Sequence, residues 1–373
     1  MGADKRSESN GGGPVTPLLI YGAYGYTGQL IVEEAVKRGW RPVLAGRDAT
    51  RLAEVADRHG LPHTAFELGD RDALDATLKK VDVVLHCAGP FRHTAQRMVE
   101  ACLRTGTHYL DITGEIEVLE SLAAQTELFE EQGIMVLPAT GFDVVPTDCL
   151  AQWLKELHPR ATQLEIAFES VGGVSRGTAH TAVEQLGEGG AVRRSGRIEP
   201  VAPAHLTREV DFGDGPVTVA SIPWGDVATA YYSTGIPNIT VYTRMPRKAI
   251  RAMKGISLVS PVLKQPPVKR VLHWLVNRQE AGPDEETRRT GRTRIWGCAS
   301  SDDGVFAEGV LVGPEGYAFT AYAAAEIVAR VLDGTVFPGF QTPAKAYGAG
   351  LVMSLPDVER ELISAPPSPE YIP

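Results

Sequence analysis

The chain has 373 residues, of which 43% are hydrophobic and 22% are charged, and its formal net charge is −9. This composition is typical of a globular protein with room for about two domains. The acidic balance argues against a nucleic-acid partner, because phosphate binding needs an excess of clustered Lys and Arg.

The N-terminal stretch MGADKRSESNGGG has no apolar segment like that of a secretion signal, and we expect residues 1–14 to form a disordered tail. No run of 18 apolar residues occurs, so no transmembrane helix is expected. The four cysteines show no CxxC spacing, and no HExxH motif is present. The sequence therefore predicts neither a disulfide framework nor a metal site, and it favours a cytoplasmic location.

Short apolar runs alternate with stretches of helical periodicity over the first 140 residues. We expect strands at 18–21, 42–45, 63–68, 81–89, 107–112 and 134–138. We expect helices at 29–38, between Asp48 and Gly60, and at 71–79, 91–104 and 115–131. Strands that alternate with helices predict an α/β fold with a doubly wound, Rossmann-like parallel sheet.

Three glycines separate the first expected strand from the first helix, in the stretch LLIYGAYGYTG at 18–28. Such glycines allow a tight turn, a close approach of pyrophosphate to the backbone, and close helix packing. The helix N-terminus then supplies N–H groups and positive charge. The alternative is a purely structural turn. We predict that a dinucleotide contacts this turn through Gly22, Tyr24, Gly25, Tyr26, Thr27 and Gly28.

The end of the second strand indicates which dinucleotide is bound. An NAD site would carry Asp or Glu there for the ribose 2′-OH, but this chain has Gly46 and Arg47. A guanidinium suits a 2′-phosphate, so we predict NADP, with NAD less favoured. Asp48 leaves the other assignment open, because a shift of one residue would place a carboxylate at the ribose.

Later strand ends would line the same crevice, because ligands of open α/β sheets bind at the carboxyl ends of the strands. The segment Cys87, Ala88, Gly89, Pro90 is small and rigid, and we expect it to lie against the nicotinamide end. Three acids are candidate catalytic groups. They are Asp111, Glu115 and Asp143. Each also has a structural interpretation, as a strand end, a helix cap or a turn.

Five motifs together resemble the saccharopine dehydrogenase-like oxidoreductases, and in particular their trans-acting enoyl reductase branch. The motifs are GAYGYTG (22–28), AGR (45–47), CAGPF (87–91), YLDITGE (109–115) and GFDVVPTD (141–148). The resemblance implies an NADP-binding Rossmann domain followed by a larger α/β (α+β) domain for substrate binding and dimerisation. It also implies a late helix that returns to the first domain. We expect these parts at 15–145, 146–316 and 317–373.

The same resemblance implies an oxidoreductase that uses NADPH to reduce a C=C bond of a small-molecule or carrier-bound acyl, polyketide or lipid-like substrate. Saccharopine-forming members reduce C=N instead, and they need charged groups for several carboxylates. Arg176 is the one evident candidate near the start of the second domain, so we favour the hydrophobic substrate. A non-catalytic nucleotide-binding scaffold is the alternative from another class.

Residues 247–276 mix basic and large apolar side chains, and Pro266 and Pro267 would divide them into two helices. Such a segment can lie on an anionic membrane or cover a core with a solvated basic face. We therefore expect a peripheral membrane contact as one interpretation, and a homodimer from the resemblance.

Overall fold

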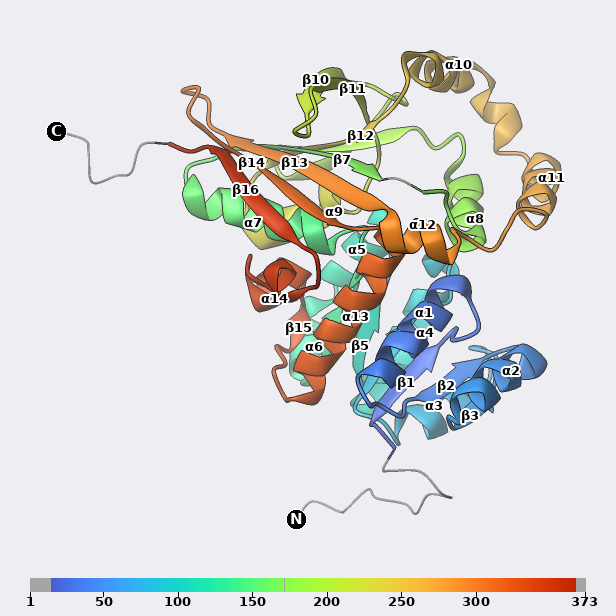
Figure 1. Cartoon of the computed structure of the whole chain (residues 1–373). Helices are drawn as coiled ribbons and strands as arrows, with labels where there is room; N and C mark the ends of the chain where they lie inside the picture. Colours follow the sequence, from blue (N-terminus) through green and yellow to red (C-terminus); the bar gives the residue numbers. More distant parts are fainter. Residues whose placement is uncertain (1–14, 171, 367–373) are drawn as a thin grey trace. The chain divides into compact units, whose positions relative to one another are not determined.

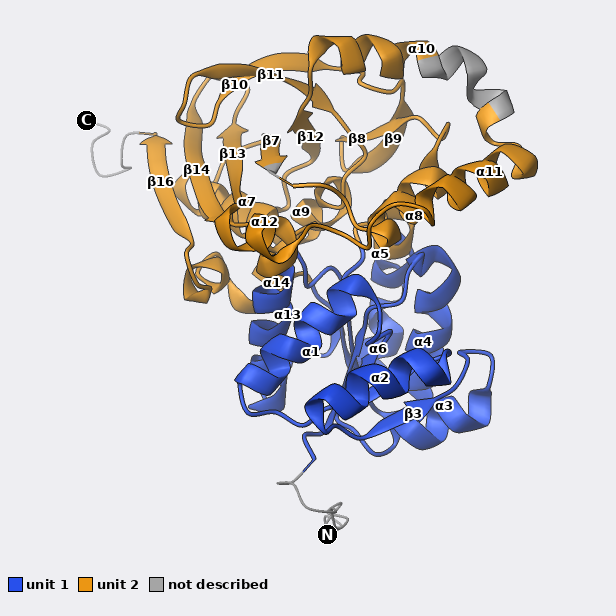
Figure 2. Ribbon diagram, turned by 45° about the vertical axis from the view of Figure 1, so that its right-hand side comes forward, with its two compact units in different colours: residues 1–113, 120–141, 320–341 blue, residues 114–119, 142–319, 342–373 orange. Residues whose placement is uncertain are grey.

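The structure is a computed structural model that describes residues 15–170 and 172–366 (Figure 1). The expected tail at 1–14 lies outside the described residues. The chain forms two compact units (Figure 2). Unit 1 takes the described residues of Met1–Thr113 together with Glu120–Gly141 and Thr320–Gln341. Unit 2 takes Gly114–Leu119, Phe142–Phe319 and the described residues of Thr342–Pro373.

Unit 1 is built on a seven-stranded sheet in the order β15-β6-β5-β4-β1-β2-β3, in which every neighbouring pair is parallel. The strands are β1 (Leu18–Tyr21), β2 (Val43–Gly46), β3 (His63–Ala65), β4 (Val83–His86), β5 (His108–Asp111), β6 (Met135–Leu137) and β15 (Gly339–Phe340). Strands β1 and β4 are buried along their whole length. This arrangement confirms the predicted Rossmann-like sheet.

Helices alternate with these strands. They are α1 (Tyr26–Lys37), α2 (Ala49–His59), α3 (Arg71–Leu78), α4 (Phe91–Thr105), α5 (Ile116–Ala123) and α6 (Thr126–Glu131). Side chains of Asp48 and Asp70 cap α2 and α3, and left-handed Gly60 and Gly106 end α2 and α4. Local residue types thus explain where the helices begin and end.

The single helix predicted for 115–131 is wrong, because the structure has two helices, α5 and α6. The amide of Gln125 donates to the carbonyl of Leu122, three residues back, at 3.0 Å. Its side chain donates to the carbonyl of Ser121 at 2.9 Å. A tightened turn and a side chain that competes for a helix carbonyl interrupt the regular bonding without Gly or Pro.

Helix α13 (Gly316–Leu332) runs from unit 2 into unit 1, and the unit boundary falls between Phe319 and Thr320. Within unit 1, Arg38 Nη1 of the turn after α1 lies 3.3 Å from Glu326 Oε2 of α13. Strand β15 then pairs with β6 in parallel. The sequence pattern did not predict this seventh strand, because two residues carry no periodicity.

Unit 2 contains a mixed nine-stranded sheet, which confirms the predicted second domain of α/β (α+β) type. Seven strands follow the order β10-β11-β12-β7-β13-β14-β16, with β8 on β12 and β9 on β8. The strands are β7 (Gln163–Ser170), β8 (Gly190–Arg194), β9 (Arg197–Val201), β10 (Thr207–Asp211), β11 (Pro216–Ser221), β12 (Asn238–Arg244), β13 (Arg292–Ser300), β14 (Phe306–Pro314) and β16 (Glu359–Ser364).

Two helices of unit 2, α10 and α11, are those that the proline pair predicts. The helices of this unit include α7 (Val145–Leu157), α8 (Arg176–Gln185), α9 (Asp226–Thr234), α10 (Arg247–Leu263), α11 (Pro266–Val276), α12 (Glu285–Thr290) and α14 (Pro343–Tyr347), with a 3₁₀ turn at Leu351–Ser354. A Cβ on Gly297 would lie 2.8 Å from Leu154 Cδ1, so this glycine lets α7 pack closely on the sheet. Among the described residues no helix combines the length and apolar character needed to cross a bilayer.

Candidate functional site

The glycine turn after β1 is closed by backbone contacts that a side chain would prevent. Gly22 has φ +85°, and a Cβ there would lie 2.9 Å from the carbonyl carbon of Cys87. A Cβ on Gly28 would lie 2.3 Å from the Gly22 carbonyl oxygen. Bare backbone is therefore a requirement of this turn, and its shape fits the predicted pyrophosphate cradle.

The third glycine prepares the start of α1. Gly25 is the N-cap, with an extended backbone at φ −69° and ψ 162°, and its amide donates to the Gly22 carbonyl at 2.9 Å. Tyr26, Thr27 and Gly28 form the first turn of the helix, whose amides have no intrahelical acceptor. These amides and the helix dipole are the groups that hold an anion at such a site.

The loop after β4 lies beside the glycine turn, because β1 and β4 are neighbours in the sheet. The amide of Cys87 donates to the Tyr21 carbonyl at 2.8 Å, and Thr94 Oγ1 donates to the Ala88 carbonyl at 2.8 Å. The strand order reverses direction between β1 and β4, which is where open α/β sheets bind ligands. The structure therefore brings the predicted segment Cys87, Ala88, Gly89, Pro90 to the expected crevice.

Arg47 follows β2 directly and is exposed, and within the described part of the chain it forms no hydrogen bond or ion pair. Asp48, by contrast, caps α2, with its Oδ1 accepting from the Arg51 amide at 3.1 Å. This contact favours Arg47 over Asp48 as the group that faces the ribose.

Arg51 is a candidate for the same site that the sequence analysis missed. Its guanidinium carbon lies 4.6 Å from the centre of the Tyr24 ring, and its Nη2 lies 3.4 Å from the Tyr24 carbonyl. A Cβ on Gly46 would lie 2.5 Å from the Tyr24 ring, so the glycine makes room for this stack. The signal that could have identified it is a second arginine in the first turn of α2, four residues after Arg47.

We expect Arg47→Asp to lower the ratio of NADPH affinity to NADH affinity by about 10- to 100-fold, because a charge-assisted hydrogen bond to phosphate is replaced by repulsion. Titration calorimetry with each nucleotide measures the ratio. Arg71→Asp, at an exposed arginine elsewhere in unit 1, is the control. An unchanged ratio in Arg47→Asp would show that Arg47 does not contact the 2′-phosphate.

The carboxylate of Asp111 is fully buried and bound on both oxygens. Its Oδ2 accepts from the Tyr109 hydroxyl at 2.6 Å, and its Oδ1 accepts from the amides of Thr113 at 2.9 Å and Ala139 at 2.8 Å. The amide of Thr140 also donates to the Asp111 carbonyl, at 2.7 Å. These contacts join the end of β5 to the loop after β6, which favours the structural interpretation of Asp111.

Asp111→Ala should therefore lower the free energy of unfolding by about 3 kcal/mol, because three buried donors lose their acceptor. Chemical denaturation measures this, with Asp57→Ala on the exposed face of α2 as the control. A variant that keeps full stability but loses activity would restore Asp111 as a catalytic candidate.

Asp143 lies half-buried in unit 2, in the loop before α7, and desolvation by the surrounding protein raises its pKa from 3.8 to about 7. A Cβ on Gly114 would lie 2.8 Å from Asp143 Oδ2. A Cβ on Gly225 would lie 2.8 Å from Val144 Cγ2 and 3.4 Å from Gly114 Cα. Three loops far apart in the sequence thus meet around this carboxyl, which can hold a proton near neutral pH.

Phe142, which precedes Asp143 in the chain, belongs to a cluster of aromatic rings. Phe142 meets Phe168 edge to face, with ring centres 5.9 Å apart, and Phe319 at 6.0 Å. Phe168 in turn packs on Trp224 at 4.7 Å. Unit 2 therefore places a proton-holding carboxyl next to a buried aromatic cluster.

Asp226 and Trp224 are further residues that the sequence analysis missed. Asp226 is fully buried, and neither carboxyl oxygen has a partner at good hydrogen-bond geometry in the described part of the chain, although the Thr147 side chain is near enough to favour the charged form. Burial, with Asp148 and Asp143 nearby, raises its pKa well above the usual value. The Trp224 Nε1 is also buried without a partner there. No sequence motif marks either residue, since their burial is a tertiary property.

The remaining predicted residue, Glu115, is buried in unit 2, and its carbonyl accepts from the amides of Val118 and Leu119 at the start of α5. A GxSxG sequence also occurs, at 173–177, but its Ser175 is the N-cap of α8 and accepts from the Thr178 amide at 3.2 Å. That geometry is a helix cap and differs from a nucleophile elbow.

In a comparison with known protein families, residues 18–137 match the saccharopine dehydrogenase NADP binding domain. A probable mitochondrial saccharopine dehydrogenase-like oxidoreductase of Arabidopsis thaliana is 33% identical over 179 residues, 42% of this chain and 39% of that protein. A saccharopine dehydrogenase-like oxidoreductase of Mus musculus is 28% identical over 217 residues, 51% of this chain and 50% of that protein. The predicted resemblance to saccharopine dehydrogenase-like oxidoreductases and the predicted NADP-binding domain are confirmed.

A trans-acting enoyl reductase of Mycobacterium leprae is 32% identical over 139 residues, 35% of this chain and 33% of that protein. The chain therefore spans half or less of the length of these relatives. Apo saccharopine dehydrogenase (L-Glu forming) of Saccharomyces cerevisiae shares the fold with a TM-score of 0.63 at 14% identity, over 93% of this chain and 99% of that one.

Proposed function

Because residues 18–137 match a saccharopine dehydrogenase NADP binding domain, we propose that this chain is an NADPH-dependent reductase. We propose that it reduces a C=C bond in a hydrophobic acyl substrate. The observation that carries the proposal lies in unit 2, where Asp143 holds a proton near pH 7 next to the aromatic residue Phe142. Reduction of an enoyl group needs one hydride and one proton.

The residues of unit 1 would bind and orient the nucleotide. The glycine turn and the first turn of α1 hold the pyrophosphate, and Arg47 with Arg51 holds the 2′-phosphate. NADPH supplies the hydride when bound. The segment Cys87–Pro90, small and close to Gly22, leaves room for the nicotinamide end.

Asp143 would supply the proton. A hydride delivered to one carbon of the double bond leaves negative charge on its neighbour, and the Asp143 O–H donates its proton to that second carbon. The new C–H bonds replace the π bond, and Asp143 takes a proton back from water. A carboxyl with a pKa of about 7 is suited to this exchange at neutral pH.

The relative of Mycobacterium leprae named as a trans-acting enoyl reductase supports this choice of bond. Phe142, Phe168 and Trp224 suit an apolar chain better than a substrate with several carboxylates. Reduction of a C=N bond remains the second candidate, because the fold is shared with a saccharopine dehydrogenase.

The first experiment is titration calorimetry with NADPH and with NADH, followed by NADPH oxidation assays. The assay compares an enoyl thioester with the imine formed from an amino acid and an aldehyde. Binding of NADPH with turnover of the thioester alone is the expected result. Turnover of the imine alone would replace the proposal with C=N reduction. Binding without any turnover of these substrates would favour the non-catalytic scaffold.

A further inference from the structure

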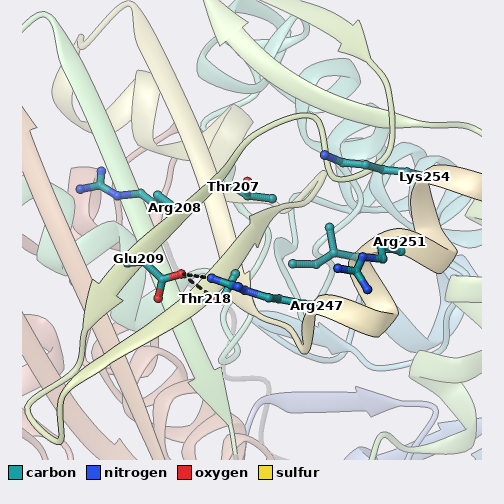
Figure 3. A pocket seen from close by; sticks show the side chains of 8 residues that line it. Thr207, Arg208, Glu209, Thr218, Arg247, Arg251 and Lys254 are labelled. Atoms are coloured by element: carbon teal, nitrogen blue, oxygen red, sulfur yellow. Dashed lines mark hydrogen bonds and ion pairs between the residues drawn. The ribbon is translucent and has the colours of Figure 1, made fainter.

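A cavity of about 390 Å³ lies in unit 2 between the β10–β11 ribbon and α10 (Figure 3). Its apolar lining residue, Ile250 of α10, is buried in one cluster with Ala204 and Ala220. Its rim is polar, with Thr207, Glu209 and Thr218 on the ribbon side. None of the residues assigned above to cofactor or proton transfer lines it.

Three cations of α10 face this cavity from one side of the helix. They are Arg247, Arg251 and Lys254, at positions i, i+4 and i+7, which a helix places on one face. Figure 3 shows all three side chains extending from α10 towards the ribbon. The one carboxylate of the lining, Glu209, is held by Thr218 Oγ1 at 2.8 Å and by Arg247 at 3.6 Å. An excess of positive charge therefore lines the cavity of an acidic protein.

Arg208 also lines the cavity but is engaged elsewhere. It alternates with Thr207 and Glu209 along β10, so its side chain lies on the other face of the ribbon, as Figure 3 shows. There it pairs with Glu165 and lies 4.6 Å from the centre of the Trp296 ring. The other cations of the lining are thus those of α10, where Arg247 pairs with Glu209 and the Arg251 side chain forms no hydrogen bond or ion pair within the described residues.

We infer that this cavity, the α10 cleft, is a binding site for a phosphate group, separate from the NADP site. A phosphate monoester carries up to two charges and several acceptor oxygens, which matches two guanidinium forks and one ammonium. The Thr207 hydroxyl adds a donor on the opposite wall. The phosphate belongs to either a small molecule or a lipid headgroup, and the chemistry of recognition is the same for both.

The test uses the full chain with saturating NADP⁺, so that the glycine turn is occupied. Inorganic pyrophosphate is titrated by calorimetry, and in a second arm the protein is floated with phosphatidylcholine vesicles that contain phosphatidic acid. The double variant R251A/K254A is compared with K248A/K264A, which removes the same charge from exposed positions in the same segment, outside the cavity lining. Alanine is compatible with the helix at the three positions that lie in α10, and Lys264 lies just after its end.

We expect at least about 10-fold weaker binding in R251A/K254A and little change in K248A/K264A. If R251A/K254A alone binds pyrophosphate more weakly, the ligand is a small-molecule phosphate. If R251A/K254A alone loses binding to the vesicles and pyrophosphate binding is unaffected, the ligand is a lipid headgroup. Either result supports the site. Equal losses in the two double variants would overturn it, because diffuse charge would then account for binding. Failure of the wild-type chain to bind either probe would also overturn it.

Discussion

Replacing Gly25 by Val is expected to weaken NADPH binding by at least about 1000-fold while unit 1 stays folded. The backbone of Gly25, at φ −69° and ψ 162°, is one that valine adopts readily. A Cβ there would lie 3.2 Å from the Gly22 carbonyl oxygen, a contact that a small shift relieves. The branched side chain would nevertheless stand in front of the first turn of α1, where pyrophosphate needs several amides. Calorimetry with NADPH measures the loss.

Gly69→Val is the matched control, since a Cβ at that exposed loop position meets nothing within 4 Å. Gly28→Ala should behave differently from both. Its Cβ would lie 2.3 Å from the Gly22 carbonyl oxygen, so it should destabilise unit 1 itself. Unchanged NADPH affinity in a folded Gly25→Val variant would remove the premise that this turn binds the cofactor.

Asp143→Asn is expected to lower kcat for enoyl reduction by about 10²- to 10⁴-fold, with NADPH affinity unchanged. The amide keeps the shape of the side chain, but its N–H groups are far too weakly acidic to protonate the substrate. In the wild-type protein kcat should be constant at low pH and fall tenfold per pH unit above about 7, as Asp143 loses its proton. The residual kcat of Asp143→Asn should not fall with pH in this range. Asp302→Asn, at an exposed acid of unit 2, is the control.

Stability gives an independent measurement on the same carboxyl. Its pKa is raised from 3.8 to about 7 in the folded state, so its contribution is fully present below the lower value and is lost as pH rises through the upper one. Relative to wild type, Asp143→Asn should therefore gain stability as pH rises from 4 to 8, and denaturant titration at both pH values measures this. If the difference in stability between Asp143→Asn and wild type is the same at pH 4 and pH 8, the pKa of Asp143 is not raised in the folded state. If Asp143→Asn keeps the full kcat, another group supplies the proton.

Local patterns sufficed for much of unit 1. The alternation of apolar runs with helical periodicity predicted the parallel sheet, and β1 lies at the predicted residues Leu18–Tyr21. The pattern failed where the deciding contact was not periodic. At Gln125 one side chain and one tightened turn divide a stretch that reads as a single helix.

The sequence by itself determined the glycine turn and the position of Arg47, because both depend on residues within one strand–helix unit. Only the tertiary structure decided what the acids do. Asp111 accepts a hydrogen bond from Ala139 across 28 positions, and Asp143 lies against Gly114 across 29, so local patterns do not reveal these contacts. The same holds for Asp226, whose pKa is raised by burial and by Asp148 and Asp143, far away in the sequence. Chain neighbours set backbone conformation, whereas burial and charge depend on residues that only folding brings together.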